Sequence, residues 1–271
     1  MPELPEVETT CRGIKPYLVD KTIQQVIVRQ MQLRWPVPDN LHEKLQGHHI
    51  RAVFRRAKYL LMEVSNGCVI LHLGMSGNLR IIPANTVAAK HDHIDFVLTD
   101  GNALRLNDPR KFGAVLWTDQ SIDKHPLFKD LGPEPLSPQF NGSLLYQKAK
   151  NCKIAVKNFI MDSHIVVGVG NIYASEALFM AGIHPNRQAG KISLKRYQKL
   201  AEAIKTVLQH AIDQGGTTLK DFVNAQGKPG YFQQSLAVYG RTEQPCLQCG
   251  QTIQQIKIAQ RSSFFCKHCQ K

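Results

Sequence analysis

The segment Leu131-Gly-Pro-Glu-Pro-Leu-Ser-Pro138 separates two parts of the chain that differ in hydrophobic period. Its three prolines fall within six residues. Proline opposes both helix and strand, because it lacks a backbone N–H group and has a fixed φ angle. We therefore expect this segment to mark a boundary between two structural domains.

Short β-rich runs precede this segment and alternate with turn residues such as Ser65-Asn-Gly67. Short strands at close spacing indicate a sandwich or a barrel. The expected strands are Val26–Val28, Ile50–Phe54, Tyr59–Val64, Cys68–Leu73, Leu79–Ile82, Ile94–Leu98 and Ala114–Trp117. Ahead of them we expect a short helix over Pro5–Leu18, because proline is tolerated in a first helical turn.

Helical periodicity follows the segment. Apolar residues recur three and four apart from Leu194 to Ala211, which predicts a helix capped by Ser193 and ended by Gly215 or Gly216. An earlier helix is expected over Ile172–Ala181. The chain is thus predicted to have an α+β fold, with a β-rich domain at residues 1–132, a helical domain at 139–236 and a cysteine-rich module at 237–271.

The last 26 residues contain two C-x-x-C pairs, Cys246/Cys249 and Cys266/Cys269, separated by 16 residues. This spacing predicts a zinc site, since each pair supplies two thiolates and the intervening segment can return as a hairpin. Two disulfides or a redox C-x-x-C motif are disfavoured for these cysteines, because disulfides are rare in the cytoplasm and no thioredoxin-like βαβ pattern surrounds them. Four protein ligands leave no open position, so the zinc is expected to be structural. The hairpin, residues 251–265, is basic; it could clamp DNA or only close the C-terminus.

The chain carries 34 Lys and Arg against 21 Asp and Glu, a net charge of +13. Such an excess favours a polyanionic partner, although a basic charge alone is also compatible with a merely soluble protein. The sequence shows neither a basic amphipathic anchor nor an apolar run long enough to span a bilayer, so no membrane association is expected. Its acidic start is unlike a signal peptide, and we expect a cytoplasmic protein.

Pro2 becomes the first residue if Met1 is removed, which is expected before a small residue. Its secondary amine would then titrate near pH ~8 and be partly neutral at physiological pH. Such an amine can attack a sugar C1′ and form a Schiff base. Glu3 and Glu6 are close enough in sequence to transfer protons. Taken alone, the pattern is more typical of a helix start.

Several motifs together resemble the bacterial formamidopyrimidine-DNA glycosylases over the whole chain. They are Pro2-Glu-Leu-Pro-Glu-Val-Glu-Thr9, Arg56-Ala-Lys58, His72-Leu-Gly-Met75-Ser-Gly, Asp108-Pro-Arg110-Lys-Phe112-Gly, Gly168-Val-Gly-Asn171-Ile-Tyr-Ala-Ser-Glu176, Gly215-Gly-Thr-Thr-Leu-Lys220-Asp, Gly227-Lys-Pro-Gly-Tyr231 and Ala259-Gln-Arg261. The resemblance implies a β-sandwich domain, a helix-two-turn-helix domain and a zinc-finger hairpin.

The resemblance also implies a bifunctional glycosylase and abasic-site lyase of base excision repair. Such an enzyme excises 8-oxoguanine and formamidopyrimidines from double-stranded DNA as a monomer in the bacterial nucleoid, and cleaves the strand by β,δ-elimination. By this likeness Pro2 is the nucleophile, Glu3 the general acid, and Lys58 and Arg261 the proton donors for β- and δ-elimination. On sequence alone, Lys58 is more typical of a solvated lysine.

The resemblance implies two kinds of DNA contact. An extruded nucleotide leaves a gap, and Met75, Arg110 and Phe112 match the positions that fill it; without the family, Met75 and Phe112 are equally typical of core packing. Asn171 is expected to cap a helix and also to bind DNA. The other expected contacts are His72, His91, Lys153, Lys157, Lys220 and Tyr239. Around Lys153 the family is richer in lysine, whereas this chain has Asn151 and Cys152. Residues 217–231 resemble the mobile loop of the family.

Two other functions are compatible with the sequence. One is an endonuclease VIII-like enzyme that prefers oxidised pyrimidines, against which Leu4, Met75, Arg110 and Phe112 favour the purine-directed branch. The other is a zinc protein that binds or bends DNA without catalysis, which leaves Pro2, Glu3 and Lys58 unexplained.

Overall fold

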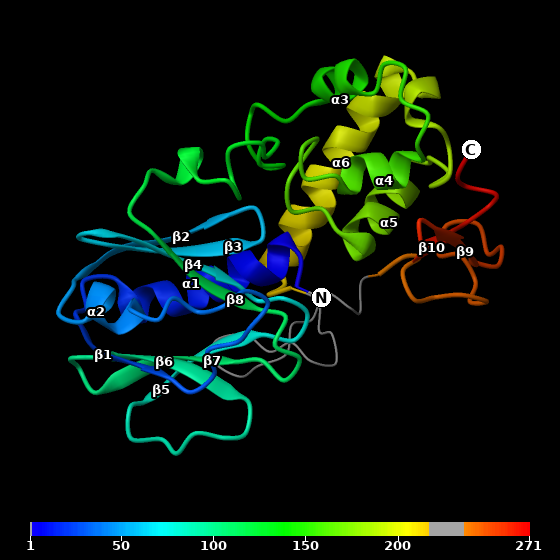
Figure 1. Cartoon of the computed structure of the whole chain (residues 1–271). Coiled ribbons are helices and arrows are strands. Elements are labelled where there is room, and N and C mark those ends of the chain that lie inside the picture. The colour runs from blue at the N-terminus through cyan, green and yellow to red at the C-terminus, as the bar shows by residue number, and fades with distance from the viewer. Residues whose placement is uncertain (1, 217–235) are drawn as a thin grey trace. The chain divides into compact units, whose positions relative to one another are not determined.

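The computed structural model describes residues 2–216 and 236–271 (Figure 1). Lys220 and the expected loop at residues 217–231 therefore lie outside the described residues. The chain divides into two compact units, one spanning Met1–Lys129 and Gln214–Gln233, the other Asp130–Asp213 and Gln234–Lys271. The domain limits expected from the sequence remain predictions. Within the described ranges, no helix combines the length and apolar character that a bilayer crossing requires.

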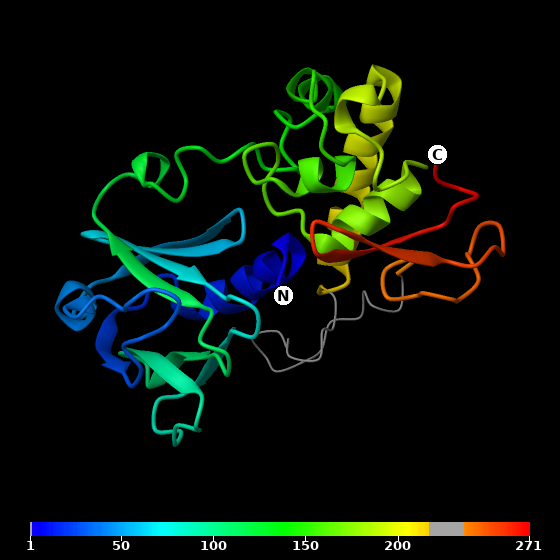
Figure 2. The same cartoon turned by 45° about the vertical axis from the view of Figure 1, so that its right-hand side comes forward.

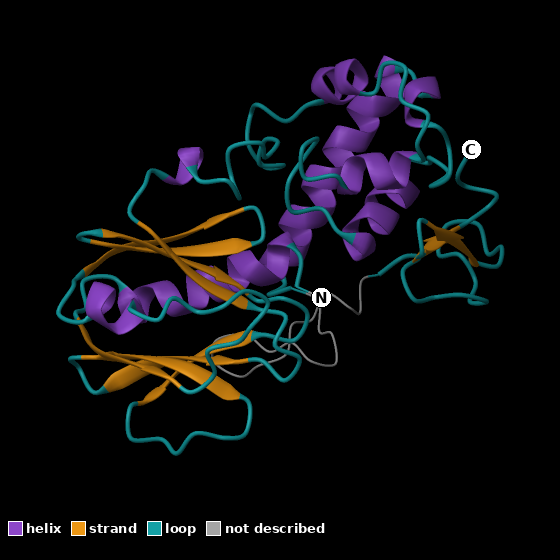
Figure 3. Cartoon of the chain, in the orientation of Figure 1, coloured by secondary structure: helices purple, strands orange, loops and turns teal. Residues whose placement is uncertain are grey.

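The first unit contains two four-stranded antiparallel sheets (Figure 3). One has the order β1-β6-β7-β5 and the other β2-β3-β4-β8. The strands are β1 (Ile23–Val28), β2 (Ile50–Arg56), β3 (Tyr59–Val64), β4 (Gly67–His72), β5 (Asn78–Pro83), β6 (Asp92–Leu98), β7 (Asn102–Asn107) and β8 (Ala114–Thr118). A short helix α2 (Leu41–Leu45) and a 3₁₀ turn η1 (Ile122–Lys124) complete the unit.

Helix α1 (Leu4–Leu18) lies between the two sheets (Figure 3). Its buried face repeats at helical spacing through Val7, Cys11, Ile14 and Leu18, and these residues belong to one apolar core with residues of both sheets. The core therefore fixes the direction in which the helix presents the N-terminal residues.

Strand β7 was not expected from the sequence, because Arg105 interrupts its apolar pattern. The side chain of Arg105 is only 2% exposed. Its guanidinium donates to both carboxylate oxygens of Asp95, at 2.7 and 2.8 Å, and to Asp92 at 3.3 Å. Both aspartates lie on the neighbouring strand β6, so the charge is matched inside the sheet.

The second unit is built from helices and a hairpin (Figure 2). Its elements are α3 (Gly142–Lys148), α4 (Val156–Met161), α5 (Asn171–Met180), the 3₁₀ turn η2 (Ala189–Lys191), α6 (Leu194–Asp213), β9 (Gln254–Ile258) and β10 (Arg261–Phe265). The predicted α+β fold, with its sheets, helical part and terminal hairpin, is confirmed. Helices α3 and α4 were not expected, because at six or seven residues they show too few turns of periodicity.

Candidate active site

The N-terminal residues are fixed by the start of α1. Pro2 is buried, as are Glu3 and Glu6. Glu3 is the N-cap of the helix, and Glu6 Oε2 accepts a hydrogen bond from the Glu3 N–H at 2.8 Å as part of a capping box. A Cβ at Gly216 would lie 3.3 Å from Glu6 Oε1, so the backbone there packs against the same carboxylate. Glu6 therefore holds the backbone that follows Pro2.

Lys58 and His72 come together at the end of the second sheet. Lys58 lies in the tight turn between β2 and β3, after Ala57, whose φ is 54°. The next residue, Tyr59, pairs with His72 across β3 and β4, and their ring centroids are 4.9 Å apart. Burial first, and then the charges of Arg34 and Lys58, lower the pKa of His72 to about 4.

His72 is therefore neutral at physiological pH. Its Nδ1 accepts a hydrogen bond from the Gly74 N–H at 3.0 Å, so the ring proton resides on Nε2. A neutral imidazole in this tautomer offers one N–H donor, which suits a phosphate oxygen without adding a charge.

Met75 and Phe112 are exposed on two loops of the first unit, by 36% and 46% respectively, so they are not core residues. The guanidinium carbon of Arg110 lies 5.0 Å from the centroid of the Phe112 ring. The loops touch backbone to backbone: a Cβ at Gly74, whose φ is 61°, would lie 2.3 Å from the Phe112 carbonyl carbon. The structure thus brings together three of the residues expected to contact DNA.

The remaining residue of this unit that was expected to contact DNA is His91. It is half-buried before β6, and its carbonyl accepts a hydrogen bond from the Asp108 N–H at 3.0 Å. Its segment is therefore attached to the loop that carries Arg110.

In the second unit, Lys157 is buried and only 1% exposed. Its ammonium donates to the Ser262 carbonyl at 2.9 Å and to Ser263 Oγ at 2.8 Å. These bonds attach α4 to strand β10, directly beside Arg261. Lys157 therefore supports the hairpin, and its expected contact with DNA remains a prediction. Lys153 is exposed, as a phosphate contact requires.

Asn171 does not cap α5, which corrects the expected cap. Gly170 is the N-cap residue, and Asn171 is the first residue of the helix. The Asn171 amide donates to the Ser262 carbonyl at 3.1 Å, so it shares this acceptor with Lys157. Helices α4 and α5 thus hold the same peptide of the hairpin.

Glu176 is a supporting residue that was not expected from the sequence, although it is an acid on a mostly apolar helix. Its carboxylate accepts three backbone N–H groups, from Ala237 at 2.8 Å, Val238 at 3.0 Å and Tyr239 at 2.8 Å. Burial raises the pKa of Glu176. The Tyr239 ring packs edge-on against Phe264 of β10, with centroids 4.9 Å apart. The expected DNA contact Tyr239 is therefore fixed to both α5 and the hairpin.

The four cysteines of the hairpin module form a metal site. Their Sγ atoms all lie within 4.8 Å of one another, with Cys246 and Cys269 at 3.9 Å and Cys249 and Cys266 at 3.5 Å. A tetrahedral zinc with Zn–S bonds of about 2.3 Å requires S–S separations of about 3.8 Å. The geometry fits one structural zinc ion, which confirms the prediction.

Arg261 follows the tight turn of this hairpin. The turn residues Ala259 and Gln260 both have positive φ, 44° and 62°, and Ile258 pairs directly with Arg261. Two such residues form the turn type that matches the twist of a hairpin, at some cost for side chains other than glycine. The Arg261 side chain is exposed, so the module presents a cation at its tip.

A two-sheet unit with a buried proline at position 2, a helical unit and a four-cysteine hairpin together define a DNA glycosylase of the helix-two-turn-helix class. Family models match over most of the chain. They are the formamidopyrimidine-DNA glycosylase N-terminal domain at residues 1–115, the helix-two-turn-helix domain of that enzyme at 131–223, and a zinc finger found in this glycosylase and in IleRS at 243–271. The chain belongs to the formamidopyrimidine-DNA glycosylase family, whose members act in base excision repair.

Individual relatives agree with this assignment. The chain is 57% identical to the formamidopyrimidine-DNA glycosylases of Syntrophotalea carbinolica and Marinobacter nauticus, over the full length of each protein. Among solved structures, it resembles the Fpg protein of Thermus thermophilus (35% identity, TM-score 0.89, 99% of this chain and 98% of the other). It also resembles a mutant of the Lactococcus lactis Fpg in complex with Fapy-dG-containing DNA (33% identity, TM-score 0.92, 100% of both chains).

Proposed function

We propose that this glycosylase is bifunctional, removing an oxidised purine and then cleaving the DNA strand through a Schiff base on Pro2. The observation that carries the proposal is the N-terminal arrangement: a proline, buried, directly before the capped helix α1, beside two buried carboxylates. A secondary amine needs a fixed direction of attack and a proton donor nearby, and this arrangement supports both.

In the proposed reaction, the Pro2 nitrogen of the methionine-processed chain attacks C1′ of the damaged nucleotide. The bond from C1′ to the base breaks, and the base leaves with the electron pair of that bond and takes up the proton that the Pro2 nitrogen loses. Glu3 donates a separate proton to the sugar ring oxygen as the ring opens. The nitrogen then shares its electron pair with C1′, which gives the iminium ion. In β-elimination a proton is lost from C2′ to solvent and the C3′–O bond breaks, and in δ-elimination a proton is lost from C4′ to solvent and the C5′–O bond breaks. Lys58 assists the first step and Arg261 the second, each by protonating the departing phosphate.

DNA binding is proposed from the charge, from the exposed groups and from the solved complexes of relatives. The net charge is +13, and phosphate contacts release counterions. His72 offers a neutral N–H donor, whereas Lys153 and Arg261 offer exposed cations. Binding should therefore weaken steeply as salt is added.

The proposed substrates are oxidised purines, because the structure presents Met75, Arg110 and Phe112 together, the combination expected for the purine-directed branch. The solved relatives were captured with Fapy-dG DNA and with carbocyclic 8-oxo-G DNA. The rate of 8-oxoguanine excision opposite cytosine should exceed that of thymine glycol. Faster removal of thymine glycol would favour the pyrimidine-directed alternative.

Borohydride trapping tests the nucleophile. Reduction in the presence of lesion DNA should give a covalent adduct, and peptide mass analysis should place the deoxyribose on Pro2. A matched sample that retains Met1 has an amide in place of the amine and should give no adduct. An adduct on any other residue, or an equal yield from the Met1-containing protein, would refute the mechanism.

A further inference from the structure

A buried carboxylate joins the two loops that carry Met75 and Phe112. Asp108 is 0% exposed. The Ser76 hydroxyl donates to Asp108 Oδ1 at 2.7 Å, and the Gly113 N–H donates to Asp108 Oδ2 at 2.7 Å. Ser76 directly follows Met75 and Gly113 directly follows Phe112, so each bond lies one residue from an exposed side chain.

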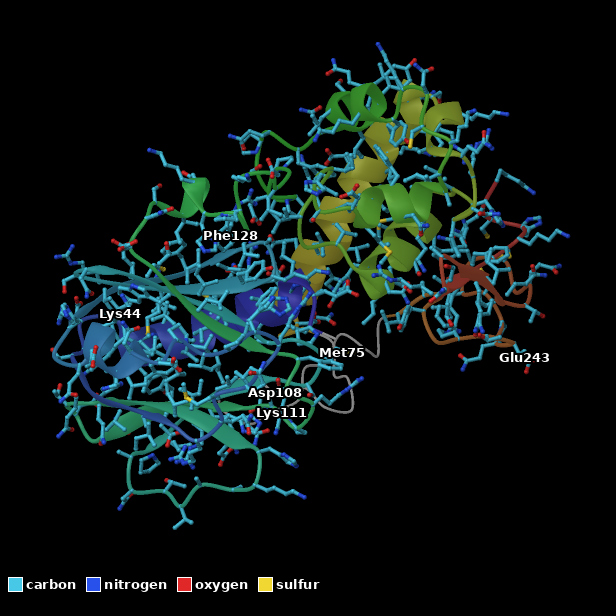
Figure 4. All side chains as sticks on the ribbon, viewed as in Figure 1. Lys44, Met75, Asp108, Lys111, Phe128 and Glu243 are labelled. Carbon is cyan, nitrogen blue, oxygen red and sulfur yellow. The ribbon has the colours of Figure 1, made fainter. Side chains whose placement is uncertain are left out.

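The same residue reaches two further segments. Ser76 Oγ also accepts the Arg110 N–H at 3.2 Å. The Asp108 carbonyl accepts His93 Nε2 at 2.8 Å, and the Asp108 N–H donates to the His91 carbonyl. Figure 4 labels Asp108 beside Lys111, whose N–H donates to the Asp108 carbonyl at 3.2 Å. Asp108 thus connects every segment of this unit that carries an exposed gap-filling candidate.

Joining two loops through a buried carboxylate costs free energy of desolvation. An ionised carboxylate out of water is destabilising unless hydrogen bonds or a cation compensate it. Among the described residues, Asp108 forms no ion pair, and its compensation is the Ser76 and Gly113 donors. Both donors come from the loops themselves, so the carboxylate is compensated only when the loops are correctly placed.

We infer that Asp108, acting through Ser76, is a positioning residue that holds Met75, Arg110 and Phe112 as a preformed wedge for the gap left by an extruded nucleotide. The inference rests on the proposed function, because it assigns a support to the side chains that fill the gap. A preformed wedge loses little conformational entropy when it enters DNA, so binding energy is available to hold the nucleotide outside the stack.

Double-mutant cycles test this inference. Ser76→Ala removes the hydroxyl that links Asp108 to Arg110 and should slow single-turnover release of 8-oxoguanine by about tenfold, as expected for a lost hydrogen bond to a buried charge. In a Met75→Ala/Phe112→Ala background, which is itself slow, the same change should cost less than about twofold, because little of the wedge is left to position. Affinity for undamaged DNA should stay constant.

Two controls separate positioning from a general loss of stability. Cys68→Ala alters a buried side chain at the other end of β4, and its effect should be equal in both backgrounds. Asp108→Asn, which weakens the carboxylate's hydrogen bonds at constant size, should show the same coupling as Ser76→Ala. Equal slowing of both backgrounds by Ser76→Ala and Asp108→Asn, or no slowing by either, overturns the inference.

Borohydride trapping, measured on the same samples, reports on the proposed mechanism separately. If the borohydride adduct forms but Ser76→Ala shows no coupling to the Met75/Phe112 pair, only the positioning role is refuted. If the coupling is observed but no adduct forms, only the Schiff base is refuted.

Discussion

Replacing Lys157 by methionine should loosen the hairpin without removing a phosphate contact. The ammonium makes two short bonds, to the Ser262 carbonyl at 2.9 Å and to Ser263 Oγ at 2.8 Å, and is almost completely buried. Charge-assisted bonds contribute roughly 1.5–3 kcal/mol each. Much of this is offset because methionine carries no buried charge and fills a similar volume. Ser262 also keeps its bond from Asn171.

The net loss should therefore be about 2 kcal/mol, which is roughly a 30-fold change in the equilibrium between attached and detached hairpin. Thermal unfolding and the rate of zinc transfer to a chromogenic chelator measure this loss. Because Ser262 is adjacent to Arg261, the fraction of δ-elimination product should also fall while β-elimination continues.

The salt dependence of DNA binding distinguishes this role from a phosphate contact. Lys157→Met should leave the slope of log affinity against log salt unchanged, whereas the exposed Lys153→Met should reduce its magnitude by about 1. If Lys157→Met reduces the slope and leaves the unfolding temperature and zinc transfer unchanged, the supporting role is refuted and Lys157 contacts DNA directly.

Three other changes have defined outcomes. Glu3→Gln should reduce base excision by at least about 100-fold while DNA affinity is retained, because the general acid is lost but the phosphate contacts remain; normal excision would remove Glu3 from the mechanism. NMR should show that His72 remains neutral at pH 6, since burial lowers its pKa from the ordinary 6.5 to about 4. Between pH 6.5 and 4 the unfolded chain therefore binds a proton at His72 more readily than the folded chain does, so folding stability declines as the pH falls through this range. His72→Gln should flatten this decline. Cys249→Ser should release zinc, measured by elemental analysis, and weaken DNA binding; unchanged affinity would show that the module does not grip DNA.

The features predictable from the sequence are those in which neighbouring residues supply the whole signal. The cysteine spacing located the zinc site, and the apolar repeat located α6, which begins at Leu194 as expected. The supporting role of Lys157 could not be predicted, because its acceptors lie more than 100 residues away in the sequence. Strand β7 was not predicted because Arg105 is charged, and its partners Asp92 and Asp95 are placed beside it only by the fold.

The residues that support the site could not be predicted from the sequence either. Asp108 and Glu176 both belong to motifs that the sequence analysis recognised, but their local sequence does not show what their carboxylates bind. Glu176 accepts backbone groups about 60 residues away, and Asp108 binds Ser76, 32 residues earlier. Backbone N–H groups are present at every residue except proline, so no side-chain pattern marks the ones that will be used.

The four-thiolate module links the enzyme to the redox state of its surroundings. Thiolates that bind zinc can be oxidised, and an oxidised sulfur no longer holds the metal on which such a small module depends for folding. The same oxidants generate the damaged purines proposed as substrates. Under severe oxidative stress, demand for repair and loss of functional enzyme should therefore increase together, and recovery should depend on available zinc and on thiol reductants.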